Sequence, residues 1–235
     1  MFCRQYRIVP VPLAALALLM AGCAQTVEGE AVRTQNSVPV VAETFSESDL
    51  EELLLSGPEA EGIVGVHGFA PMRDRDTSSR MNVNPNPVSD EGCRAAVFAA
   101  QKAVYADSGW SGVRDQVLST PSSQQTVEQT VVLYPLADEA RTFFDSARQT
   151  WQSCSGTTVS VGTGDEATHW DIGDVVTEHA LFTQPSVEKD HPEWPCDHAL
   201  AVSANLVFET MACGMGISNQ AATMAIRLAD KAASR

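Results

Sequence analysis

Two neighbouring runs of apolar and small residues lie near the C-terminus, at residues 196–203 and 206–213. Both runs place apolar residues at odd and at even positions, which is typical of strands that are covered on both faces of a sheet. A two-residue turn at residues 204–205 would join them as a hairpin and place Cys196 directly opposite Cys213. Such a non-hydrogen-bonded pair brings the two Cα atoms to about 4.5 Å. The pattern therefore predicts an interior hairpin closed by a disulfide.

Apolar residues recur every three or four positions in three longer segments, which indicates amphipathic helices. Helices are expected at residues 138–154, from Ser89 or Asp90 to about residue 107, and after a cap at Ser218. Shorter helical turns are expected after Ser48 and at residues 59–64. The residues expected to face the core are Ala140, Phe143, Phe144, Ala147 and Trp151 in the first long helix, Cys93, Val97, Ala100 and Val104 in the second, and Ala221, Met224, Ala225, Leu228 and Ala232 in the third.

Further strands follow from runs of β-branched and aromatic residues between turn residues. They are expected at residues 125–134, 157–161, 166–172 and 175–182, with residues 110–119 as either a strand or a loop. A tight turn at Gly173-Asp174 would pair the last two strands, with His169 facing Glu178. Long irregular segments are expected at residues 68–88 and 184–195. Because no βαβ alternation is present, the order of elements favours an α+β fold, a sheet with helices on its faces.

The N-terminus has the layout of a bacterial secretory leader. Two arginines precede an apolar run, and Ala21-Gly22 precede Cys23. Small residues before a cysteine resemble the lipobox of bacterial lipoproteins, in which that cysteine receives a diacylglycerol; the alternative is an ordinary leader with a cysteine nearby. We therefore expect a leader at residues 1–22, a lipidated N-terminus and flexible tether at 23–45, and one folded domain at 46–235, anchored on the outer face of the cell membrane.

The charge of the chain narrows the classes of partner. The formal charge is −15, and removal of residues 1–22 takes away Arg4 and Arg7 and no acidic residue, which leaves −17. Nucleic acid is therefore not expected as a partner. An anionic lipid surface would not attract such a chain either, so the lipid is expected to hold it at the membrane. An acidic body favours a neutral or cationic ligand.

The cysteines predict two disulfides. One of the six lies in the leader and Cys23 is the lipid site, which leaves four in an exported domain. With Cys196 assigned to Cys213, Cys93 is left for Cys154, and both point inward from their helix stripes. A zinc site is the alternative, but CxxC and HxxxH spacings are absent. We expect no metal and no other cofactor.

A set of anchor residues between positions 46 and 233 resembles the PknH-like extracellular sensor domain family, which occurs in mycobacterial serine/threonine kinases and actinobacterial lipoproteins. The resemblance implies a central antiparallel sheet with flanking helices, a cleft for an unidentified ligand, and disulfides that pair the first cysteine with the second and the third with the fourth. A kinase domain and a transmembrane helix are not found in the sequence. The anchors are residues 53–55, Cys93, 105–109, 131–135, 137–140, Phe144, 151–154, 170–173, 196–200, 205–207 and 212–214.

Four residues are candidates for binding a ligand: His169, Glu178, Trp194 and His198. His169 and Glu178 would share one sheet face with Asp171, although a solvated cross-strand pair is the alternative. Trp194 would stand in the loop at residues 184–195, where an aromatic side chain can border a cleft.

The motifs of known catalytic sites are absent, since GxSxG, HExxH, a P-loop and a complete GxGxxG are not present. We therefore expect no catalytic residue and no enzyme activity. The leading hypothesis is a lipid-anchored extracytoplasmic sensor or ligand-binding domain. An envelope protein that docks on a membrane partner and a secreted hydrolase are the alternatives.

Overall fold

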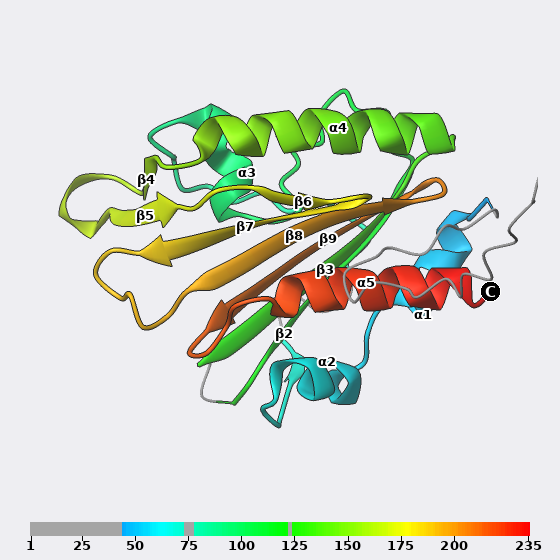
Figure 1. Ribbon diagram of the computed structural model, residues 1–235, viewed down its shortest axis with the longest axis horizontal. Coiled ribbons are helices and arrows are strands. Elements are labelled where there is room, and N and C mark those ends of the chain that lie inside the picture. Colours follow the sequence, from blue (N-terminus) through cyan, green and yellow to red (C-terminus); the bar gives the residue numbers. More distant parts are fainter. Residues whose placement is uncertain (1–43, 73–77, 122–123) are drawn as a thin grey trace, which may run out of the picture. The chain divides into compact units, whose positions relative to one another are not determined.

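The computed structural model describes residues 44–72, 78–121 and 124–235, and the statements below concern these residues. Nine strands form one antiparallel sheet (Figure 1). Neighbouring strands follow the order β1-β2-β3-β9-β8-β7-β5-β4, and β6 also pairs with β7. The strands are β1 Ala70–Pro71, β2 Gly112–Ser119, β3 Gln125–Leu133, β4 Thr158–Val161, β5 Thr168–Ile172, β6 Val176–Glu178, β7 Leu181–Glu188, β8 Cys196–Ser203 and β9 Leu206–Gly214.

Two long helices cover the sheet, α4 (Ala137–Cys154) on one face and α5 (Gln220–Ala233) on the other (Figure 1). The predicted α+β fold, with a central antiparallel sheet flanked by helices, is confirmed. The shorter helices are α1 Leu50–Leu53, α2 Gly57–Val64, α3 Arg94–Val97 and the 3-10 helices η1 Glu47–Asp49, η2 Glu91–Cys93 and η3 Gly164–Glu166.

The core has a layer on each face of the sheet. On one face, Phe143, Phe144 and Trp151 of α4 pack on Phe182 and Val207 of the sheet. On the other face, α5 and α1 pack on a second apolar layer of the same strands. Strands β8 and β9 lie between the two layers and are almost wholly buried, as the apolar residues at both odd and even positions predict. The inward stripes of both long helices are confirmed.

Both predicted disulfides are present. Cys196 pairs with Cys213 across β8 and β9 at a Cα distance of 4.1 Å, and the turn at Ala204 takes a positive φ of 51°. Cys93 is bonded to Cys154 across 61 residues, which ties η2 to the end of α4. In the loop-entropy model, closing a loop of that length contributes about 4 kcal/mol to stability.

The predicted helix from residue 90 to residue 107 is wrong beyond Val97. Helix α3 ends there, because Phe98 is extended and Ala100 takes a positive φ of 53°. The amide of Ala100 donates instead to the carboxylate of Glu209 at 3.1 Å, a bond that a continuing helix would prevent. A buried acceptor that is distant in sequence therefore overrides the local helical pattern. We call residues 98–108 the covering segment.

The predicted hairpin around Gly173-Asp174 is also wrong. Strands β5 and β6 do not pair with each other; both pair with β7, β6 along its first residues and β5 along its last. His169 therefore faces Ser160, and Glu178 faces Leu181 across a turn that contains His179 at a φ of 53°.

The change of partner along β7 occurs at Pro185, which lies within the strand. A proline has no amide to donate, so it suits the gap between two successive partner strands. Gly173 lies against it, and a Cβ at Gly173 would come within 2.7 Å of the Pro185 ring. The predicted loop at residues 184–195 is wrong in its first part, since β7 continues to Glu188.

Candidate functional site

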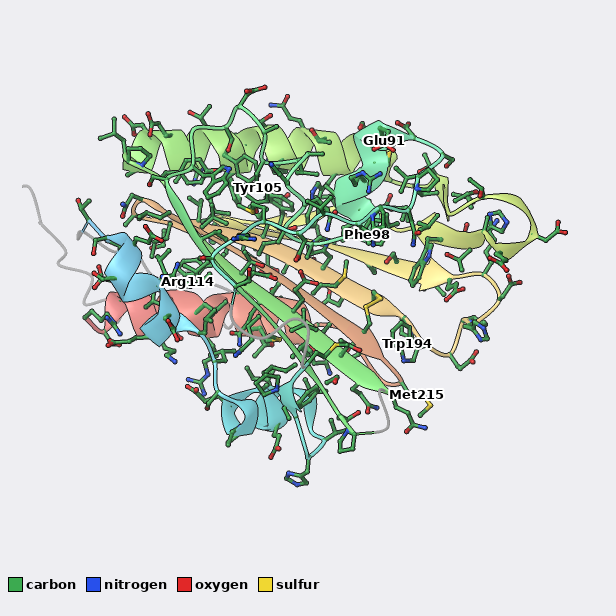
Figure 2. All side chains as sticks on the ribbon, turned by 180° about the vertical axis from the view of Figure 1, so that it is seen from behind. Glu91, Phe98, Tyr105, Arg114, Trp194 and Met215 are labelled. Carbon is green, nitrogen blue, oxygen red and sulfur yellow. A yellow bond between two sulfur atoms is a disulfide. The ribbon has the colours of Figure 1, made fainter. Side chains whose placement is uncertain are left out.

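A cavity of about 660 Å³ opens between α4 and the segment that includes α3 and the covering segment. Helix α3 ends after Val97, so the chain along this flank of α4 is an irregular segment and not a second long helix. In Figure 2, the labelled Glu91, Phe98 and Tyr105 follow this segment beside α4. The volume is within the range of small-molecule sites.

Helix α4 gives the cavity two neighbouring stripes of side chains with different chemistry. Residues Phe143, Ala147 and Trp151, spaced by four, form an apolar floor, and Ala95 and Val104 complete it from the opposite side. The second stripe carries hydroxyl groups, also spaced by four: Thr142, Ser146 and Thr150. The cavity can therefore hold an apolar body and offers hydrogen-bonding groups along one edge.

Four charged side chains line the cavity: Glu91, Arg94, Asp107 and Glu139. Arg94 and Glu91 form a bidentate pair, with Nε at 2.8 Å and Nη2 at 2.9 Å from the two carboxylate oxygens. This hydrogen bond lowers the pKa of Glu91 and raises that of Arg94. Asp107 and Glu139 have no ion pair with any described residue, and the Oε2 atom of Glu139 is buried without a hydrogen-bond partner there.

A buried polar cluster holds the covering segment to the sheet. The Oε2 atom of Glu209 accepts hydrogen bonds from the Tyr105 hydroxyl at 2.6 Å and the Ala100 amide at 3.1 Å. Its Oε1 atom lies 2.9 Å from Nε2 of His198. Burial, together with the adjacent carboxylate, raises the pKa of Tyr105 far above its usual range, so the hydroxyl stays protonated and donates. The Tyr105 ring stacks on Phe143 of the cavity floor at 4.4 Å.

The structure does not gather the four predicted ligand-binding residues into one site, and none of them lines this cavity. His169 is exposed and bonded to Ser160, with 2.8 Å between Nδ1 and Oγ. Glu178 is exposed on β6, and His198 is wholly buried in the cluster around Glu209. Trp194 is partly exposed and its indole donates to the carbonyl of Gln124 at 2.9 Å. Figure 2 shows it close to Met215 and away from α4.

The sequence predicts Phe143, Ala147 and Trp151 as core residues but assigns none of the residues that line the cavity to a ligand site. One signal was available: the hydroxyl stripe of Thr142, Ser146 and Thr150 lies directly beside the apolar stripe of α4. Asp107 could not be found in this way, because its position depends on where α3 ends.

Asp197 is a further buried acid. Burial raises its pKa to about 6, although its Oδ2 atom accepts the Ala221 amide at 2.9 Å in the first turn of α5. This contact ties β8 to α5, so the structural role accounts for the residue.

The described residues contain neither a cluster of metal ligands nor a membrane-spanning helix. No group of three or more His, Cys, Asp or Glu side chains there is placed to hold a metal ion. None of the described helices combines the length and the apolar character needed to cross a bilayer.

Comparison with known proteins identifies the family. Residues 45–235 match the model of the PknH-like extracellular domain. The chain is 30% identical over 188 residues to the serine/threonine-protein kinase PknH of Mycobacterium bovis, covering 79% of this chain and 31% of that protein. PknH of Mycobacterium tuberculosis strain H37Rv matches at the same identity and over 30% of its length. The chain thus spans about three-tenths of these relatives.

The solved structures place the match in the part of those relatives that lies outside the cell. The crystal structure of the extracellular domain of PknH from Mycobacterium tuberculosis superposes with a TM-score of 0.77 at 29% identity, and it covers 82% of this chain and 99% of that domain. The match is therefore to an extracellular domain and gives no ground for assigning kinase activity to this chain. The chain belongs to the PknH-like extracellular domain family.

Proposed function

We propose that the chain is a lipid-anchored extracytoplasmic sensor that binds a ligand in the cavity beside α4 and catalyses no reaction. The observation that carries the proposal is this cavity, with its apolar floor and hydroxyl edge, in a domain of an extracellular family. The Ala21-Gly22-Cys23 junction supports the anchor, although Cys23 lies outside the described residues. A protein that is exported by its leader, anchored by a lipid and able to bind a ligand would act as a sensor in the cell envelope.

The chemistry of the cavity favours binding over catalysis. None of the described residues that line it is a histidine or a cysteine, so a nucleophile with an imidazole base is not assembled there. The hydroxyls of Thr142 and Thr150 donate to backbone carbonyls of α4, which orients their oxygens as acceptors rather than activating them. These groups suit the recognition of a ligand.

A sensor also needs a connection between its ligand site and the rest of the domain. The floor residue Trp151 lies 4.1 Å, between ring centroids, from His198, and Phe143 stacks on Tyr105. Both partners contact Glu209 in the middle of the sheet. A ligand on the floor therefore acts on the buried cluster that fixes the covering segment.

Ligand binding is tested by identifying the envelope compounds that copurify with the protein. Ser146 is exposed at the cavity edge, so Ser146→Trp should fill the opening without overpacking the core. The matched control is Gln149→Trp, an exposed position of the same helix that does not line the cavity. Compounds that copurify from a mycobacterial host are compared by mass spectrometry. We expect a compound that is retained by the unchanged chain and the control but lost from Ser146→Trp.

A different result would favour the docking alternative. If the three proteins retain the same compounds and all capture the same membrane protein, the cavity is not the functional site. The surface that contacts the membrane protein would then be the functional site.

The lipid anchor has its own test. Cys23→Ala should move the protein from the membrane fraction to the soluble fraction, because a lipid on Cys23 is the proposed attachment. Fractionation followed by a carbonate wash and mass spectrometry of the N-terminal peptide measures this. Protein that stays with the membrane after the wash would show that the anchor lies elsewhere.

A further inference from the structure

The charges around the cavity beside α4 are not balanced. Of its four charged lining residues, Glu91 and Arg94 neutralise each other. The other two, Asp107 and Glu139, are both carboxylates and have no cationic partner within the described chain. The cavity thus carries a net charge of the sign that attracts cations.

Arg94 is not available to an anionic ligand. Its side chain is largely buried, and its guanidinium donates to both carboxylate oxygens of Glu91. It also donates to the backbone carbonyls of Asn84 at 3.3 Å and Asn86 at 3.2 Å. A guanidinium has five N–H donors in a fixed fork, and most of them are therefore occupied by the protein itself.

Glu139 provides a second and independent observation. Its Oε2 atom is buried and accepts no hydrogen bond from any described residue. A buried carboxylate oxygen without a donor is unfavourable, and a donor that arrives with a ligand removes this cost. Glu139 lines the cavity, so rotation of its side chain would present this oxygen to a donor that enters there.

The identity of the donor follows from the rest of the lining. A metal ion would need at least a third ligand, and the described residues hold no such group here. An ammonium group carries three donors and a positive charge, which matches two carboxylates and the nearby hydroxyls. The apolar floor of Phe143, Ala147 and Trp151 requires an apolar body next to that group.

We propose that the cavity binds an organic ammonium compound, with its charged group at Asp107 and Glu139 and its aliphatic or aromatic body on the floor formed by α4. This inference rests on the proposed ligand-binding function and specifies the class of ligand. The net charge of the whole domain acts in the same direction, because an acidic surface raises the local concentration of cations.

Three probes of equal length separate the charge from the apolar body: octylamine, octanol and octanoate. Each is titrated at neutral pH into the chain from Ala24 to Arg235, which retains every described residue. Binding is followed by calorimetry, and its position by shifts of the backbone amide NMR signals of Thr142, Ser146 and Thr150. We expect octylamine to bind at the cavity, octanol more weakly, and octanoate not at all.

Variants then assign the charged end of the site. Glu139→Gln and Asp107→Asn should each weaken octylamine binding about tenfold, since each removes a hydrogen bond to a charged group. Asp145→Asn is the matched control: it removes the same charge from a half-buried position of α4 that pairs with Arg141 and does not line the cavity. Asp145→Asn should leave the octylamine affinity unchanged. Glu139→Gln should leave the octanol affinity unchanged.

Three results would overturn the inference, and none of them changes the copurification test of the proposed function. If octanol or octanoate binds at the cavity as tightly as octylamine, the cavity is a ligand site but not a site for ammonium compounds. If Asp145→Asn weakens octylamine binding as much as Glu139→Gln, the effect comes from overall charge. If octylamine does not shift the α4 amides, or binds equally well to Ser146→Trp, the cavity does not hold it and the inference fails.

Discussion

Replacing Glu209 by alanine is expected to destabilise the folded domain by about 3 to 5 kcal/mol, the range found when one partner of a buried polar or charged pair is removed. The change deprives three groups of their acceptor: the Tyr105 hydroxyl, the Ala100 amide and His198 Nε2. Both Glu209 and His198 are buried, so water does not readily replace the lost bonds. Urea unfolding followed by circular dichroism measures the loss.

Two comparisons make the result specific. Glu178→Ala removes an exposed glutamate from β6 and should change stability by less than about 0.5 kcal/mol. Tyr105→Phe in the Glu209→Ala background should cost much less than it does alone, because the hydroxyl has already lost its partner. Strictly additive losses would contradict the role assigned to the cluster.

The same variant reports on the covering segment. The Ala100 amide is protected from exchange with solvent by its bond to Glu209, and local opening exposes it. In Glu209→Ala, this amide should exchange faster than those of β8 and β9, which keep their pairing. Equal exchange in the two regions would show that the segment is held by other contacts.

Elements fixed by short-range rules could be predicted from the sequence. The turn at residues 204–205 sets the register that brings Cys196 opposite Cys213, and both facts are contained in one short stretch. Helix α4 and helix α5 follow from stripes of apolar residues within each helix. No distant contact is needed to produce any of these elements.

The two elements predicted wrongly depend on residues that are far apart in the chain. Helix α3 ends early because Ala100 bonds to Glu209, 109 positions away. Strands β5 and β6 both pair with β7, on either side of Pro185, and not with each other. The local sequence pattern contains neither Glu209 nor β7. The apolar periodicity therefore predicts a longer helix, and the Gly-Asp pair predicts a hairpin.

The cavity could not be predicted for the same reason. Its apolar floor is predicted from the sequence as the inward face of α4, but the opening beside it is bordered by the covering segment, where the sequence predicts a helix that the structure does not form. The prolines and the aromatic residue of the loop that holds Trp194 instead predict a ligand site at that loop. The two locations lead to different expectations for the two tryptophans, Trp151 and Trp194.

Trp151→Ala is expected to destabilise the domain by about 3 to 5 kcal/mol, the usual cost of truncating a buried aromatic residue to alanine. The side chain is 1% exposed, packs edge-on against Phe182 with 4.9 Å between centroids, and lies against His198. Trp194→Ala should cost only about 1 kcal/mol, since it removes one hydrogen bond and a partly exposed ring. Thermal and urea unfolding of both variants measure the difference.

Binding by the same two variants decides between the two locations. If the ligand occupies the cavity beside α4, Trp194→Ala keeps the octylamine affinity of the unchanged chain. Trp151→Ala, measured where it remains folded, should bind with altered affinity, because part of the floor is gone. A loss of affinity in Trp194→Ala at unchanged stability would instead return the ligand site to the loop after β7, as the sequence predicts. Equal destabilisation by the two changes would show that Trp194 belongs to the core, and its exposed edge could then not border a cleft.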